Sequence, residues 1–473
     1  MIAAVSGITA IAAKEIRALL RDGRLWGLGT LLAVLLLAVL ASSAHQRQQA
    51  EQERRAVETA ARQQWDQQGD RNPHRAAHFG LYAFKPRSAL SSVDAGIDAQ
   101  AGQALWLEPH KRNLAMFAPA ADAAPSLGLG DFNPAFLLFA LVPLLVLVLG
   151  HGSVTQEREL GTLRMLQACG LRASALVLGK WLGLSAGLML VLAPALLAGG
   201  WLLAAEQDAL HAGLLLLALL LYYALWAAIT VLVSALSRTS RAALLVLLAL
   251  WVGAVFIAPR LAASSVAQRM PLPTGEQFWS RIHHDIAQGL PGDGSAAQRL
   301  QAFDAQLLAD NGVARLEDLP FGANARRRLF RDAYATRVHA LHFAQLWDDQ
   351  LAQQRRLRWA GVVTPYPAMR AISSALAGTD LAHRQHFEEA AEQYRQHYTT
   401  LMDEWDMHAT RGVTSFESRY GGNAQWQTMP QWRYAAPGAG FALRGSRADW
   451  AILSAWLLLA LGALCWSARR LKP

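Results

Sequence analysis

Six apolar runs limit what this chain can fold into. Each run is almost free of charged residues, and together they cover residues 25–44, 134–150, 181–203, 214–236, 242–258 and 450–466. A helix rises about 1.5 Å per residue, so runs of about 20 residues are long enough to cross the hydrocarbon core of a bilayer, which is about 30 Å thick. We therefore expect an all-α polytopic membrane protein with six transmembrane helices.

The charges of the loops indicate which side of the membrane each loop occupies. With six spans, both termini and two short loops lie on one side of the membrane. That side carries thirteen basic and four acidic residues, and the difference equals the net charge of +9 of the whole chain. The two long segments between spans are balanced: residues 45–133 contain ten basic and ten acidic residues, and residues 262–449 contain twenty and nineteen. Short loops rich in Lys and Arg stay in the cytoplasm, so we expect cytoplasmic termini and two exterior insertions.

The basic balance does not indicate a nucleic-acid partner. In a soluble protein, a net charge of +9 would suggest binding to nucleic acid. Here the excess charge is spread over loops at one membrane face, where it sets the orientation of the spans. The two cysteines, Cys169 and Cys465, fall in a cytoplasmic turn and in the last span, so the exterior insertions are expected to be held by helix packing without disulfides.

These boundaries divide the chain into segments of different character. In chain order we expect a cytoplasmic interfacial helix (1–24), transmembrane helix 1 (25–44), an exterior insertion with a stalk helix (45–133), transmembrane helix 2 (134–153), a cytoplasmic helical turn (154–172), transmembrane helices 3–5 (173–261), a large helical exterior domain (262–449), transmembrane helix 6 (450–467) and a cytoplasmic tail (468–473). The apolar spacing over 8–21 suits a helix in the membrane interface, and a long start to the first span is the alternative.

The two insertions differ in composition. Residues 45–68 are rich in Gln, Arg and Glu and contain no Gly or Pro, which predicts a stalk helix of roughly 30 Å that continues the first span. Prolines and glycines after residue 69 predict loops with short helical or strand pieces. The second insertion is long enough for a core of its own, and 323–359 and 379–410 are typical of long helices. An apolar stripe at helical spacing on the latter predicts its buried face.

The short polar turn between the second and third spans contains the most informative motif. It reads Glu159-Leu160-Gly161-Thr162-Leu163. A charged helix between two spans can receive force from a soluble partner: the acidic residues offer charge, Gly161 lets a partner backbone come close, and the leucines hold the helix to the bilayer edge. The alternative interpretation of such a turn is a solvated loop.

This turn resembles the coupling helix of the membrane subunits of ABC transporters of the type 2 permease family. The family wording is an acidic residue, any residue, Gly, Thr and then an apolar pair, following an interfacial N-terminal helix and preceding the third of six spans. The resemblance implies that the turn docks on a nucleotide-binding subunit. The residues that would make this ATPase-coupling contact are Glu157, Arg158, Glu159, Gly161, Thr162, Leu163 and Leu166.

The resemblance also implies partners and location. A permease of this family is a dimer, with itself or with a paralogous permease, in the bacterial inner membrane, where it contacts lipid and is driven by two copies of a cytoplasmic ATPase that bind ATP and Mg. The long insertions resemble a subgroup with large periplasmic segments, in which Pro365, Pro367 and residues 376–380 have counterparts. Export or extracytoplasmic assembly is the implied activity, and a periplasmic partner is a further expectation.

No catalytic motif is recognised in the chain itself. A phosphate-binding loop needs Gly, four residues, Gly-Lys and then Ser or Thr, whereas Gly179-Lys180 is followed by Trp181 at the start of a span. We therefore expect no ATPase, no cofactor and no enzymatic activity in this chain. An intramembrane protease would need His-Glu-x-x-His or polar catalytic groups within the spans, and the spans contain hydroxyls without His or Asp.

The histidines are concentrated in the exterior insertions. His339 with His342, and His383 with His386, lie three residues apart, and two such helices side by side would offer four ligands to zinc. Other histidines on the second helix are separated by three full turns, which is typical of a solvated helix face. We therefore expect no metal site.

The fourth span carries a polar and aromatic group that admits two interpretations. Tyr222, Tyr223, Trp226 and Thr230 are candidates to line a translocation route, and interface anchoring or helix packing is the alternative.

For the whole chain, the alternative to an exporter permease is a helical membrane receptor or scaffold. Its exterior domain would bind a partner without transport.

Overall fold

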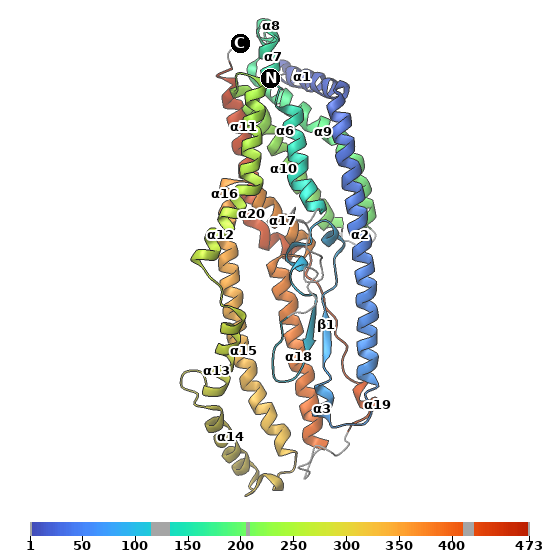
Figure 1. The fold of residues 1–473 in the computed structure, drawn as a ribbon, viewed down its shortest axis with the longest axis vertical. Helices are drawn as coiled ribbons and strands as arrows, with labels where there is room; N and C mark the ends of the chain where they lie inside the picture. Colours follow the sequence, from blue (N-terminus) through green and yellow to red (C-terminus); the bar gives the residue numbers. More distant parts are fainter. Residues whose placement is uncertain (1, 115–132, 205–208, 410–420, 472–473) are drawn as a thin grey trace.

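The computed structural model describes residues 2–114, 133–204, 209–409 and 421–471, so part of the first insertion and the end of the tail, with Lys472, lie outside the described residues. The molecule is elongated, with both termini at one end (Figure 1).

Its elements, in chain order, are α1 (Ile2–Arg21), α2 (Gly23–Asp66), α3 (Pro73–Ala77), β1 (Leu81–Phe84), η1 (Ala89–Ser92), η2 (Gly96–Ala99), β2 (Ala104–Leu107), α5 (Pro134–Phe136), η3 (Leu137–Leu141), α6 (Val142–Gly150), α7 (Thr155–Glu159), α8 (Thr162–Ala168), α9 (Ala173–Ala204), α10 (Ala209–Leu236), α11 (Ser240–Val252), η4 (Gly253–Ile257), α12 (Ala258–Arg269), α13 (Gly275–Gln288), α14 (Ala296–Asn311), η5 (Leu316–Asp318), α15 (Ala323–Arg358), α16 (Ala360–Val363), α17 (Tyr366–Ala377), α18 (Leu381–Ala409), α19 (Asn423–Trp426) and α20 (Ala439–Ala468).

Within the described residues, six helical stretches are long and apolar enough to cross a membrane. They are Gly23–Asp66, Pro134–Glu159, Ala173–Trp201, Ala209–Leu236, Ser240–Arg269 and Ala439–Ala468. These stretches coincide with the six apolar runs, so the predicted all-α polytopic fold is confirmed. The fifth and sixth helices extend beyond their apolar runs on one side, because the hydrogen bonds of a helix continue where the apolar sequence pattern stops.

The helices that leave the bundle carry a second body of structure, which we call the distal domain (residues 45–114, 262–409 and 421–438). The opposite end of the molecule, with both termini, is called the proximal end (Figure 1).

Helix α2 is continuous for 44 residues, through the first apolar run and the segment expected to be a stalk. On the stalk, Arg54 pairs with Glu51 at 2.6 Å and with Glu58 at 2.7 Å, and such pairs one turn apart support a helix in water.

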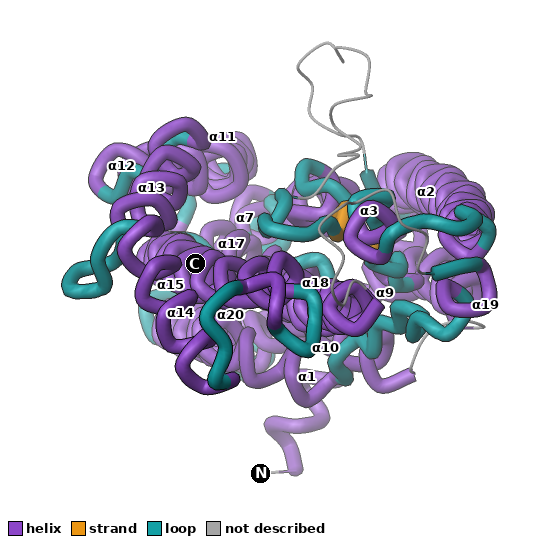
Figure 2. The backbone as a smooth tube through the Cα atoms, turned by 90° about the horizontal axis from the view of Figure 1, so that it is seen from below, coloured by secondary structure: helices purple, strands orange, loops and turns teal. Residues whose placement is uncertain are grey.

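The distal domain is built around two long helices and a hairpin. Viewed from its end, helices α13–α15 lie on one side, α2, α3 and α19 lie on the other, and α18 lies between them (Figure 2). Strands β1 and β2 pair antiparallel, with Leu81 opposite Leu107. The predicted apolar stripe of α18 faces inward: Phe387 and Tyr398 are fully buried and pack in one core with Trp65 of α2.

Helix α1 is separate from the first span and packs on α9. Figure 1 shows α1 lying across the proximal end of the bundle, and the chain bends at Asp22, whose side chain caps α2. Gly179, Gly183 and Gly187 of α9 face α1 at intervals of one turn. A Cβ at Gly179 would lie 2.6 Å from the Cβ of Ile11, so the glycines permit the close approach of the two helices.

We predict that Gly179→Ala destabilises the protein whereas Gly200→Ala, on the same helix, does not. The alanine at 179 would meet Ile11 and the carbonyl oxygen of Ile8, and overpacking of this kind costs about 1–3 kcal/mol. No atom lies within 4 Å of a Cβ at Gly200, so the gain in helix propensity of about 1 kcal/mol would remain. Thermal unfolding of the two variants in detergent measures the difference, and equal melting temperatures would contradict the close packing of α1 on α9.

Candidate functional site

The turn between the second and third spans consists of two short helices rather than the single helix expected over 154–172. Helix α7 ends at Glu159 and α8 begins at Thr162, and Gly161 between them has φ 71° and ψ 0°. This left-handed conformation is accessible to glycine at little cost, so the helix breaks and restarts there. In Figure 1, α7 and α8 project at the proximal end, next to both termini.

Glu157 is buried in a cluster of four charged groups at the base of this turn. Its Oε1 accepts hydrogen bonds from Lys14 Nζ of α1 at 2.5 Å and from Lys180 Nζ of α9 at 2.9 Å. The same Lys180 ammonium donates to Glu15 Oε2 at 2.7 Å, and Thr162 donates its hydroxyl hydrogen to Glu157 Oε2. Two carboxylates therefore face two ammonium groups, and this ion cluster joins α1, α7, α8 and α9.

The ion cluster corrects the interpretation of Glu157 as a charge offered to a partner. The side chains of Glu157, Glu15 and Lys180 are buried, so their hydrogen bonds are made within the chain. Breaking a buried ion pair by removing one partner typically costs about 3–5 kcal/mol, because the other charge is left uncompensated. Lys14, Glu15 and Lys180 were not recognised in the sequence as part of this turn, although Lys180 is the charged residue that directly precedes an apolar run.

Arg158 and Glu159 bind the turn to the next loop at the same end. The Arg158 guanidinium donates to the carbonyl oxygens of Ser237 and Ala235, at the C-terminal end of α10, where carbonyls lack partners within the helix. The Glu159 carboxylate accepts hydrogen bonds from the backbone N–H and the hydroxyl of Ser240, both at 2.8 Å, at the N-terminus of α11. Each charge thus lies at the helix end whose dipole it complements.

The turn exposes a small apolar surface surrounded by polar residues, which we call the exposed tip. The residues of the exposed tip are all solvent-exposed: Gln156, Glu159, Leu160, Gly161, Arg164 and Met165. Leu160 is 77% exposed and Met165 is 68% exposed. By contrast, Leu163 is fully buried in the main core and Leu166 packs against that core. Large apolar side chains exposed beside charges on a structured turn are typical of a protein interface.

The four candidate route residues of α10 make packing contacts. All four are buried, and the hydroxyls of Tyr222 and Tyr223 donate to the carbonyl oxygens of Phe139 and Leu138 at 3.0 and 3.1 Å. These carbonyls belong to η3, a π-helical turn whose altered hydrogen-bond pattern is completed by the tyrosines. An apolar cavity of about 610 Å³ lies among α2, α9 and α10, and none of the four residues lines it.

The four candidate histidines of the second insertion have four different partners. His339 Nδ1 lies 2.8 Å from the carbonyl oxygen of Ala335, and His342 Nε2 lies 2.7 Å from Asp285. In α18, His383 Nδ1 contacts Asp380 Oδ1, and His386 Nδ1 lies 3.1 Å from the hydroxyl of Tyr434. The structure therefore does not bring the two pairs together into one four-ligand site.

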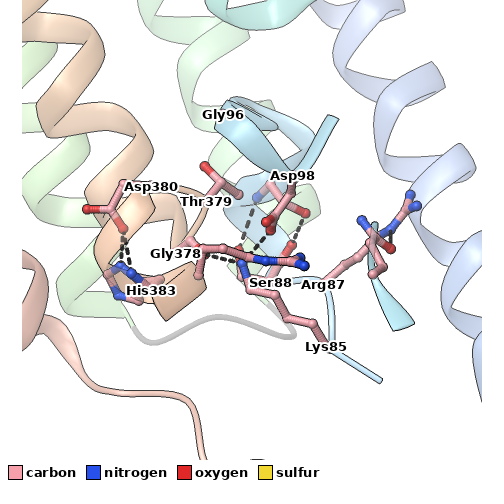
Figure 3. A network of polar contacts seen from close by, with 12 residues as sticks. Lys85, Arg87, Ser88, Gly96, Asp98, Gly378, Thr379, Asp380 and His383 are labelled. Atoms are coloured by element: carbon pink, nitrogen blue, oxygen red, sulfur yellow. Dashed lines mark hydrogen bonds and ion pairs between the residues drawn. The ribbon is translucent and has the colours of Figure 1, made fainter. Parts of the chain in front are cut away.

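A polar network joins the two insertions close to the membrane bundle (Figure 3). Lys85 Nζ donates to Asp98 Oδ2 at 2.5 Å and to the carbonyl oxygen of Gly378 at 2.9 Å. Thr379, at the joint between α17 and α18, accepts a backbone hydrogen bond from Ile97 at 2.9 Å. A Cβ at Gly96 would lie 2.3 Å from the Thr379 carbonyl oxygen, so the first insertion approaches this joint as closely as glycine allows.

Two family models match the chain. The model described as ABC-2 family transporter protein matches residues 9–304, which is more than half of the 473 residues and extends from α1 into α14. The model described as a domain of unknown function (DUF3526) matches residues 275–435, which form most of the distal domain. No curated protein matches the chain.

We predict that Lys180→Met destabilises the protein far more than Lys14→Met, although both lysines bind the same Glu157 oxygen. The side chain of Lys180 is 5% exposed and that of Lys14 is 53% exposed. Loss of the buried ammonium leaves the Glu15 carboxylate uncompensated and Glu157 with Lys14 alone, at a cost of about 3–5 kcal/mol, whereas an exposed pair contributes about 0–1 kcal/mol. Unfolding of both variants in detergent provides the measurement. Equal losses would show that the burial of Lys180 does not determine how much this ion cluster stabilises the bundle.

Proposed function

We propose that this chain, which belongs to the ABC-2 family of transporter proteins, is the permease subunit of an ABC exporter that is driven by a separate ATPase. Membership of this family, together with the six candidate spans, identifies the chain as a multi-pass membrane permease. The proposal adds the direction of transport and the partner: two copies of a cytoplasmic ATPase hold ATP and Mg, and this chain supplies the membrane route. The substrate would be exported or assembled outside the cytoplasm.

The observation that carries the proposal is the way the exposed tip is attached to the spans. Leu160 and Met165 offer an apolar contact to a soluble partner, and Glu159 offers part of a polar rim. Directly behind them, the ion cluster of Glu157 binds α1 and α9, and Arg158 binds the end of α10. A push on the tip would therefore be transmitted to several helices at once, which is the requirement for switching a helical bundle between two packings.

Orientation follows from the charge of the proximal end. The tip lies beside both termini, and the loops at this end carry the whole excess of positive charge. We therefore place the proximal end in the cytoplasm and the distal domain in the periplasm of a bacterium with the spans in the inner membrane. A second copy of this chain, or a paralogous permease, would complete the transporter, and a periplasmic partner would bind the distal domain.

We predict that Leu160→Glu prevents association with the ATPase without affecting the fold. The side chain is exposed, so the charge disturbs no internal packing, but it would replace an apolar contact at the docking surface. The variant should insert normally yet fail to co-purify with the ATPase or to support its stimulated turnover. Glu159→Arg should weaken docking by about 10- to 100-fold, because it reverses the charge of the rim and also removes the hydrogen bonds with Ser240 that hold the turn.

The matched control is Leu341→Glu, an exposed leucine of α15 in the distal domain, which should keep normal ATPase association. The rival function, a receptor or scaffold with inert cytoplasmic loops, predicts that neither leucine variant changes ATPase association. Normal association and turnover for Leu160→Glu would therefore remove the docking proposal and favour the receptor.

A labelling experiment tests the orientation. In a background without Cys169 and Cys465, a cysteine at Gln100 in the distal domain should react with a membrane-impermeant maleimide in intact spheroplasts, whereas a cysteine at Met165 should react only after lysis. Both positions are exposed, so burial does not explain a difference. Labelling of Met165→Cys in intact cells would reverse the proposed topology.

A further inference from the structure

Three histidines from separate parts of the first insertion converge in the distal domain. His74 lies in the short helix α3 and His78 follows its last residue, and the interval of four residues places both rings on the same face of one helical turn. The third ring, His110, comes from the turn after β2, and its centroid lies 5.1 Å from His74 and 5.3 Å from His78. One potential ligand atom from each ring lies within 4.8 Å of the other two.

The spacing of the first two rings is that of neighbouring metal ligands. The Nε2 atoms of His74 and His78 are 3.2 Å apart. Two nitrogens bound to a tetrahedral zinc ion at about 2.0–2.1 Å are roughly 3.3 Å apart, so little movement is needed to place an ion between them.

Carboxylates lie behind two of the three rings. His110 Nδ1 lies 2.8 Å from Asp332 Oδ1 of α15, and His74 Nδ1 lies 3.6 Å from Asp403 Oδ1 of α18. The Asp332 carboxylate is within hydrogen-bond distance of His110 Nδ1, and a carboxylate that accepts the Nδ1 hydrogen leaves the lone pair on Nε2 and orients the ring toward an ion. Asp403 makes a longer, electrostatic contact with His74. Both carboxylates come from the second insertion, so each would support a ligand supplied by the first insertion.

The backbone holds His110 in an unfavourable conformation. It has φ 72°, and it is the one non-glycine residue with positive φ in the described parts of the chain. The turn is closed by bridge pairing between Glu108 and Lys111 and by their ion pair at 2.8 Å. Strained residues of this kind persist where a particular side-chain placement is required, which is consistent with a ligand.

A cavity adjoins the cluster and supplies room for a further ligand. Its volume is about 650 Å³, and its lining includes His74, His110, Arg327, Arg328 and Arg331. A site with three imidazoles leaves a fourth tetrahedral position for water or for an anionic group. The cavity is wide enough for water to reach that position, and its lining carries both guanidinium groups and the Asp332 carboxylate.

We propose that His74, His78 and His110 bind one divalent first-row transition-metal ion of the kind that prefers imidazole, such as Zn²⁺ or Cu²⁺. Nitrogen ligands exclude Mg²⁺ and Ca²⁺, which take oxygen ligands. The bound ion would connect α3 to the turn after β2 and, through Asp332 and Asp403, to both long helices of the distal domain. This proposal concerns the distal domain alone and does not depend on the docking of an ATPase.

The test measures zinc retained by the full-length, untagged protein. The protein in detergent is stripped with chelator, incubated with Zn²⁺, desalted and analysed by elemental mass spectrometry. Wild type should retain about one zinc per chain more than His78→Gln, His74→Gln or His110→Gly. His284→Gln, which changes an exposed histidine of α13, is the matched control and should retain the wild-type amount.

Two features ensure that a loss of zinc binding in the variants would not simply reflect misfolding. His78 is exposed, and glycine readily adopts the backbone conformation of residue 110, so both variants are expected to fold. Zn²⁺ should raise the melting temperature of wild type and of His284→Gln by several degrees, and Mg²⁺ should not. The proposal is overturned if wild type retains no zinc above the three variants, or if Zn²⁺ shifts the melting of all of them equally.

Discussion

The buried ion pairs of Lys180 with Glu15 and Glu157 determine how the proximal end of the bundle is assembled. Charges at the edge of a bilayer are stable only when they are compensated, and here two carboxylates and two ammonium groups from three separate segments satisfy one another. This requirement fixes α1 against α9 and fixes the base of the exposed tip. The glycines of α9 then allow the backbones of α1 and α9 to approach closely.

The distal domain is attached to the membrane bundle through helices that the two bodies share. Its helices α2 and α12 are continuations of membrane spans, so the two bodies share continuous helices instead of a flexible linker. The network around Lys85 and Thr379 then joins the two insertions at the joint between α17 and α18 (Figure 3). Movement of the spans and movement of the distal domain are therefore mechanically linked.

Sequence reasoning recovers features that repeat along one helix and misses those that need tertiary contact. The six spans and the inward stripe of α18 were predictable, because apolar content and period are properties of a single segment. The break at Gly161 has a local signal, a glycine within a helical pattern, but its conformation depends on the contacts of both flanking helices. The burial of Glu157 depends on Lys14 and Lys180, which lie far away in the sequence. His74, His78 and His110 were not predicted as a group, because His110 lies 32 residues after His78 in the sequence.

The length of α2 has a mechanical consequence. The helix begins after its capping residue Asp22 at the proximal end and remains unbroken to Asp66, and its Trp65 is packed in the core of the distal domain. Forty-four residues extend about 65 Å, so a tilt of about 10° around the proximal end would carry the far end sideways by about 11 Å. The helix acts as a lever arm: small rotations at the proximal end become displacements comparable to a helix diameter at the opposite end of the molecule.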